Sequence, residues 1–71
     1  MLRDDKMYGK RIKDLRQEKG LTQSQLAEKI GTTASAVGKY EREQLQPNVE
    51  TVKLLCAFFE VSADYLLGFI E

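Results

Sequence analysis

The hydrophobic and polar positions near the middle of the chain predict two short helices joined by a tight turn. Leu26 and Ile30 lie four residues apart and give the first helix an apolar stripe. Gly31 follows at once, and glycine accepts the positive φ that a sharp turn needs. Either Thr32 or Thr33 then offers a hydroxyl group that can cap the second helix.

The second helix, expected over about residues 33–42, has only a thin apolar stripe. Val37 and Tyr40 are its large apolar side chains, and both fall on one side. The opposite side carries small and basic residues, which suits a helix that lies against a polar partner. A helix-turn-helix that places its second helix in the DNA major groove has this layout. The opposite side consists of Ser35, Lys39 and Arg42, with Ala34 and Gly38 flanking them.

Three more helices are expected around this pair, so the predicted fold is all-α with five helices in one domain, residues 1–71. The first covers about 7–19, stops at Gly20 and follows a frayed end at 1–6. Asn48 and Ser62 can cap the last two helices, of which the second covers about 63–69. The apolar residues expected in the core are Tyr8, Ile12 and Leu15 in the first helix, Val49, Val52, Leu55, Cys56 and Phe59 in the fourth, and Leu66 and Leu67 in the fifth.

Charge is distributed unevenly along the chain, although the formal net charge is zero and the pI is near 6.3. Residues 1–42 hold ten Lys/Arg against six Asp/Glu, whereas residues 43–71 hold one against five. A net charge of zero argues against a nucleic-acid partner. The basic half nevertheless contains the second helix of the central pair.

The composition excludes several classes of function. No histidine is present, and the single cysteine, Cys56, cannot supply a zinc cage or an internal disulfide. No run approaches the ~18 apolar residues of a membrane span, and the charged N-terminus lacks the apolar core of a signal peptide. We therefore expect a cytoplasmic protein that is not an enzyme, with no metal, cofactor, membrane or small-molecule substrate.

Several short motifs stand in a fixed order between about residues 7 and 68. Outside the central pair they are GKRIKDLRQEKGLTQ, Pro47 and VSADYLLG; inside it they are Gln23, Leu26-Ala27, Gly31, Val37 and Tyr40-Glu41-Arg42. Together they resemble the helix-turn-helix of the phage Cro/repressor family, also called the XRE type. The resemblance implies sequence-specific binding to double-stranded DNA and transcriptional regulation, with repression expected.

The second helix is expected to read base edges with its N-terminal part and its polar side. Ala34 suits contact with a thymine methyl, Ser35 discriminates weakly, and Lys39 can reach either guanine or a phosphate. Gly38 either allows the backbone to approach DNA closely or is a tolerated defect. The residues expected to read bases are Thr33, Ala34, Ser35, Gly38 and Lys39, and those expected to contact the DNA backbone are Thr22, Gln23, Arg42 and Gln44.

Two polar residues before the second helix have alternative interpretations. Arg16 is either a solvated charge or, as the resemblance implies, the partner of Glu41 in an ion pair that locks the first helix to the third. Thr22 and Gln25 stand at the spacing of a capping box. Gln23, in the same turn, is either a surface glutamine or, as the resemblance implies, a phosphate contact that also steadies the second helix.

The chain departs from the family after Arg42. A glycine and a basic loop are usual there, whereas this chain has Glu43-Gln44-Leu45-Gln46. Glu43 lacks the freedom of glycine for a left-handed cap, and the loop lacks lysine and arginine for phosphates. Fewer phosphate contacts are therefore expected.

Apolar residues near the acidic end predict a surface for a second copy of the chain. The alternative is that the fifth helix folds over Leu54 and Phe58. A homodimer would bind a palindromic operator whose half-sites lie about one helical turn (~34 Å) apart. The competing hypothesis is a protein-interaction module, such as an antitoxin or regulator partner, with weak or lost DNA binding; the chain is alternatively the N-terminal part of a longer repressor. The predicted dimer contacts are Leu54, Phe58, Tyr65, Phe69 and Ile70.

Overall fold

The computed structural model describes residues 7–69, which form five helices and no strand. This confirms the all-α, five-helix prediction. The predicted frayed end at residues 1–6 and the predicted dimer contact Ile70 lie outside the described residues. The helices are α1 (Tyr8–Glu18), α2 (Gln23–Ile30), α3 (Ala34–Glu41), α4 (Val49–Phe59) and α5 (Ala63–Leu66).

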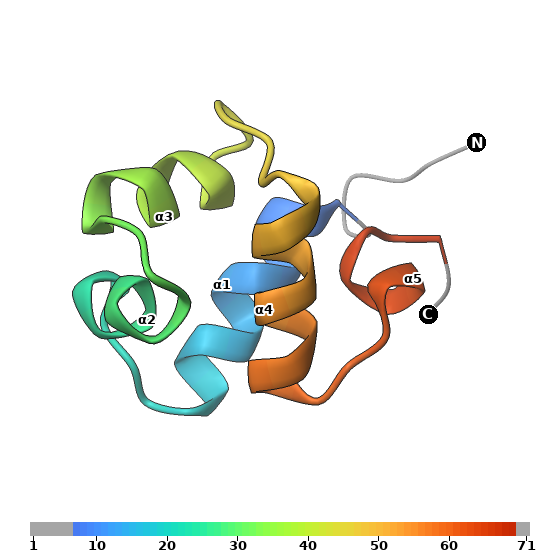
Figure 1. Ribbon diagram of the computed structural model, residues 1–71, viewed down its shortest axis with the longest axis horizontal. Helices are drawn as coiled ribbons and strands as arrows, with labels where there is room; N and C mark the ends of the chain where they lie inside the picture. Colours follow the sequence, from blue (N-terminus) through green and yellow to red (C-terminus); the bar gives the residue numbers. More distant parts are fainter. Residues whose placement is uncertain (1–6, 70–71) are drawn as a thin grey trace.

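The helices pack so that α3 lies at the edge of the molecule (Figure 1). α2 and α3 contact each other, α1 contacts α3, and α4 packs against α2. α2 and α3 lie on one side of α1 and α4, and α5 lies on the other side, where it contacts both α1 and α4 (Figure 1). Because α1 and α2 support α3 from within, the side of α3 that faces away from them is left for solvent or a partner.

Each of the five helices contributes one fully buried aliphatic side chain to a common core. These residues are Ile12, Leu26, Val37, Leu55 and Leu66. Burying one such side chain stabilises the fold by about 1.5–3 kcal/mol, so every helix is anchored at its own point. Ala27, Ile30, Tyr40 and Phe59 complete the buried cluster.

The expected stripe of α4 was wrong at its first position. Val49 is 75% exposed, whereas Leu55 is fully buried and Phe59 is only 7% exposed. Val49 is the first residue of the helix, whereas Val52, three residues closer to Leu55, packs against the core. Cys56 is half-buried and packs against the core, as expected for a small core residue, and burial raises the pKa of its thiol.

Side-chain caps start four of the five helices, where the sequence predicted them. In each case the side-chain oxygen accepts from a backbone N–H three residues later, at 2.8–3.1 Å. Thr33 rather than Thr32 caps α3. α1 differs, because Met7 precedes it and provides no side-chain cap. The capping residues are Thr22, Thr33, Asn48 and Ser62.

Each helix is followed, within two residues, by a residue with left-handed φ, and the next residue donates its backbone N–H to a carbonyl five positions earlier. This is the hydrogen bond that closes a Schellman motif. Three of the left-handed residues are glycines, but the other two are glutamates. The last turn stops α5 at Leu66, so the predicted helix over 63–69 was too long. The left-handed residues are Gly20, Gly31, Glu43, Glu60 and Gly68.

Candidate nucleic-acid interface

The exposed side of α3 carries the small and basic residues that the sequence placed there. Ser35 and Lys39 are exposed, while Val37 and Tyr40 on the other side are buried at 0% and 7% exposure. Thr33, the capping residue, is exposed as well. Ala34, at the start of the helix, is half-buried. α3 therefore presents a polar side that the rest of the domain does not cover.

Gly38 is not on that open side but buried beneath two polar side chains. An added Cβ would lie 3.1 Å from Arg42 Nη1 and 3.5 Å from Gln23 Oε1. The sequence placed Gly38 among the base-reading residues, either as a point of close backbone approach or as a tolerated defect, and in the structure Gly38 is buried. The absence of a side chain at this position makes room for Arg42 and Gln23 to lie close to α3.

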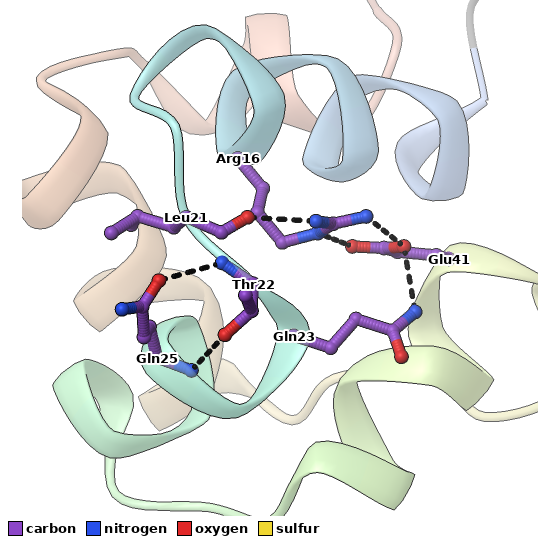
Figure 2. Close-up of polar contacts among 6 residues, drawn as sticks. All are labelled: Arg16, Leu21, Thr22, Gln23, Gln25 and Glu41. Carbon is purple, nitrogen blue, oxygen red and sulfur yellow. Dashed lines mark hydrogen bonds and ion pairs between the residues drawn. The ribbon is translucent and has the colours of Figure 1, made fainter.

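A hydrogen-bonded network joins α1, α2 and the last turn of α3 (Figure 2). Arg16 Nε donates to Glu41 Oε2 at 2.6 Å and Arg16 Nη2 donates to Glu41 Oε1 at 3.1 Å. The third guanidinium nitrogen, Nη1, donates to the Leu21 carbonyl at 2.8 Å. The side chains of Arg16 and Glu41 are only 12% and 4% exposed. Of the two interpretations of Arg16, the structure contains the ion pair.

Gln23 connects the start of α2 to the same network. Its Nε2 donates to Glu41 Oε1 at 3.1 Å (Figure 2), so it ties the first turn of α2 to the end of α3. Thr22 and Gln25 beside it form the capping box that the sequence predicted, with bonds of 3.0 and 2.9 Å. An amide nitrogen has two hydrogens, so Gln23 keeps one donor beyond the bond to Glu41.

The loop after α3 is held in place by contacts with α1. Glu43 does adopt the left-handed conformation, with φ of 61°, and its Oε2 accepts from the Gly9 N–H at 2.8 Å. The Tyr8 hydroxyl donates to the Leu45 carbonyl at 3.3 Å. Burial, and secondarily the charge of Glu43, raise the pKa of Tyr8. The sequence had not anticipated that Glu43 would take this turn.

Arg42 and Gln44 lie together beside the end of α3. Arg42 caps the helix, and its Nε donates to Gln44 Oε1 at 3.1 Å. Both residues are exposed. The four residues expected to contact the DNA backbone thus form two separate pairs in the structure. Thr22 and Gln23 stand at the start of α2, and Arg42 and Gln44 follow α3.

The predicted dimer contacts do not share one environment. Leu54 is 46% exposed and Phe69 is 68% exposed. Phe58, expected to be exposed, is half-buried: it packs against the core and meets the Phe59 ring edge-on at a centroid distance of 5.1 Å. Tyr65 is half-buried beneath a guanidinium from α1. Phe58 and Tyr65 therefore have packing roles within the domain.

Two residues of α1 were missed by the sequence interpretation. Arg11 is only 8% exposed; its Nη1 donates to the Tyr65 carbonyl at 2.9 Å and its guanidinium stacks 4.0 Å from the Tyr65 ring centroid. This contact fastens the short α5 to α1. Gly9 is buried against the end of α3, where an added Cβ would lie 2.6 Å from the Glu41 carbonyl oxygen. Neither contact has a local signal, because both depend on how distant helices cross.

The site consists of two helices, α2 and α3. One side of α3 packs against α1 and α2, and the other side, with Ser35 and Lys39, is exposed. A helix-turn-helix family model matches residues 12–66 of the sequence. The chain belongs to this helix-turn-helix family. The match includes the core residues of all five helices, from Ile12 to Leu66, and it agrees with the resemblance to Cro/repressor proteins.

Proteins similar to this chain include regulators and repressors. The uncharacterised HTH-type transcriptional regulator YobD of Bacillus subtilis is 42% identical over 65 residues, which cover 92% of this chain and 58% of YobD. The P22 c2 repressor, solved in complex with a synthetic operator, has a TM-score of 0.82 and 31% identity over 86% of this chain and 92% of the repressor chain. The N-terminal DNA-binding domain of SinR from Bacillus subtilis has a TM-score of 0.78 and 36% identity, covering 93% of this chain and 94% of the domain.

The chain spans about half the length of the curated relatives it matches. Those relatives are named as HTH-type transcriptional regulators. In the part of the chain that the structure describes, no helix combines the length and apolar character needed to cross a bilayer.

Proposed function

We propose that this domain binds double-stranded DNA through α3 and regulates transcription without catalysing a reaction. The observation that carries the proposal is the exposed polar side of α3. Ser35 and Lys39 face solvent there, while Val37 and Tyr40 hold the helix in the core. Similarity to the P22 c2 repressor, which was solved with an operator, supports docking of α3 in the major groove.

Base readout is assigned to the exposed and half-exposed residues of α3. Ala34 offers a methyl group, Ser35 a hydroxyl group, and Lys39 a long donor that reaches guanine or a phosphate. Thr33 stands at the helix start, the end that enters the groove. Gly38 instead makes room for Arg42 and Gln23. With so few specific donors, much of the discrimination is assigned to DNA shape and half-site spacing.

Contacts with the DNA backbone are assigned to the two places that flank α3. At the start of α2, free backbone N–H groups and the helix dipole favour a phosphate beside Thr22 and Gln23. The second amide hydrogen of Gln23 is available for that phosphate. After α3, the terminal nitrogens of Arg42 can donate to another phosphate. The Arg42 Nε already donates to Gln44 Oε1, and this hydrogen bond holds the guanidinium in place.

A symmetric homodimer on a palindromic operator completes the proposal. Exposed apolar side chains in the C-terminal half support a surface for a second copy. Two copies would place their α3 helices in half-sites about 34 Å apart. A DNA partner also implies a cytoplasmic location. The exposed large apolar residues of that half are Leu45, Val49, Leu54 and Phe69.

A protein-interaction module is the second candidate. It is favoured by the loop of residues 43–46, which contains no lysine or arginine, and by the net charge of zero. In this alternative the exposed apolar residues bind a different protein and DNA binding is weak. The salt dependence of DNA binding separates the two candidates, because each phosphate contact releases counterions.

The test is to measure the affinity for a selected duplex at several salt concentrations, in the wild-type domain and in two lysine variants. We expect affinity to fall steeply with salt. Lys39→Ala should either lower the slope of log K against log salt by about 1 or change the preferred bases. Lys53→Ala is the matched control, because Lys53 is likewise exposed but belongs to α4 and not to the proposed reading helix. Binding that ignores salt, or equal effects of the two variants, would contradict the proposal.

A further inference from the structure

The start of α1 obtains its cap from a distant part of the chain. Met7 offers no side-chain acceptor, and the first turn of α1 contains no acidic residue. The Gly9 N–H nevertheless donates to Glu43 Oε2 at 2.8 Å. A carboxylate suits this position because the first N–H groups of a helix lack partners and the helix dipole is positive there.

Glu43 reaches Gly9 from a backbone conformation that is unfavourable for glutamate. Its φ is 61°, in the left-handed region that glycine tolerates best. The turn is closed by the Glu43 N–H to the Tyr40 carbonyl at 3.0 Å and by the Gln44 N–H to the Lys39 carbonyl at 2.8 Å. The bond to Gly9 offsets the strain, which explains how glutamate is accommodated at this turn.

Gly9 allows α1 to touch the last turn of α3 directly. An added Cβ would lie 2.6 Å from the Glu41 carbonyl oxygen and 2.8 Å from the Tyr40 carbonyl oxygen. The Glu43 side chain closes over the same point, because its Cγ would be 2.7 Å from that Cβ. Backbone packing and the carboxylate thus fasten α1 to the end of α3 at one place.

We propose that Glu43 is a positioning residue for DNA binding, which acts by capping α1 from the loop after α3. The cap fixes the turn that carries Arg42 and Gln44, the two residues assigned to a phosphate on this side. This inference rests on the proposed function. It also opposes the simplest electrostatic expectation, in which removing an acidic residue beside a DNA-binding surface strengthens binding.

The chain offers a matched control for this inference. Glu60, which ends α4, has a φ of 59°, nearly the same as Glu43. Within residues 7–69 its side chain makes no hydrogen bond, whereas that of Glu43 binds Gly9. Glu43→Gly and Glu60→Gly therefore make the same change in charge and backbone freedom, whereas only Glu43→Gly also removes the cap.

The experiment compares wild type, Glu43→Gly, Glu43→Gln and Glu60→Gly at a temperature where circular dichroism shows all four folded. Glu60→Gly should raise the urea midpoint and leave DNA affinity unchanged. Glu43→Gly should not raise the midpoint, and it should weaken binding to the selected duplex by about three- to tenfold, a loss of the size expected for one typical hydrogen bond. Glu43→Gln keeps an oxygen acceptor at the same reach and should recover most of that affinity.

Amide hydrogen exchange tests the cap without DNA. The Gly9 amide should exchange at least ~tenfold faster in Glu43→Gly than in wild type, as expected when a hydrogen bond that protects it is removed. The inference is overturned if Glu43→Gly binds DNA as tightly as wild type, if it matches the urea midpoint of Glu60→Gly, or if Glu43→Gln is as weak as Glu43→Gly. If the wild type selects no duplex, the proposed function fails, while exchange and urea data still decide whether the cap exists.

Discussion

Removing the Glu41 carboxylate is the perturbation that most directly tests how α3 is held. Glu41 accepts two hydrogen bonds from Arg16 and one from Gln23, and its side chain is 4% exposed. In Glu41→Ala the Arg16 guanidinium keeps only its bond to the Leu21 carbonyl. A charged group that is 12% exposed would then lack its counterion.

The expected cost is large compared with the stability of a domain of this size. Breaking one side of a buried ion pair costs about 3–5 kcal/mol. At about 0.05–0.15 kcal/mol per residue, a 71-residue chain has a total stability of roughly 4–11 kcal/mol. Replacing both partners by apolar residues, as in Arg16→Met with Glu41→Leu, avoids the unpaired charge and should cost less than Glu41→Ala alone.

Urea unfolding at about 15 °C, near the temperature of maximum stability, provides the assay. Lys10 and Asp14 form an exposed pair on α1, 3.1 Å apart, so Asp14→Ala is a control expected to cost less than ~1 kcal/mol. We expect Glu41→Ala to lower the urea midpoint strongly, the double variant to lower it less, and Asp14→Ala hardly at all. The reasoning would be refuted if Glu41→Ala lowered the free energy of unfolding by less than about 1 kcal/mol. It would also be refuted if the double variant were less stable than Glu41→Ala alone.

Three further substitutions or reactions have outcomes that the structure fixes. Gly9→Ala should lower the urea midpoint by the equivalent of about 1–3 kcal/mol, because its Cβ would meet the Glu41 carbonyl oxygen at 2.6 Å and backbone cannot easily move. Gly38→Ala should be neutral or stabilising by up to ~1 kcal/mol, since its neighbour at 3.1 Å is the flexible end of Arg42. Cys56 should react with iodoacetamide at pH 8 more slowly in the native than in the urea-unfolded chain, because burial raises its thiol pKa and lowers the thiolate fraction; equal rates would contradict this.

Features that depend on neighbouring residues were predictable from the sequence. The caps at Thr22, Asn48 and Ser62 and the turn at Gly31 all have a local cause, and the structure contains them. The periodicity likewise identified Val37 as a core residue of α3. The ion pair between Arg16 and Glu41 could not be predicted from local sequence alone. Only the resemblance to a family favoured this ion pair over a solvated Arg16 side chain.

Features that depend on how helices cross were not predictable. The stripes of α4 overlap, and its packing against α2 and α5 decided that Leu55 rather than Val49 is buried. Gly9 and Arg11 acquired their roles from helices distant in the sequence, α3 and α5. Glu43 adopted a conformation that propensity disfavours, because Gly9 offered its carboxylate a hydrogen bond.

The central claim, that α3 reads DNA, is tested most directly by selection from a random pool of duplexes followed by sequencing. We predict that the wild-type domain enriches a palindrome with half-sites about one helical turn apart. Ser35→Ala or Lys39→Ala should lose that enrichment or change it at one position in each half-site. No enrichment by the wild type, or an unchanged palindrome with both variants, would contradict the claim that the exposed side of α3 is the reading surface.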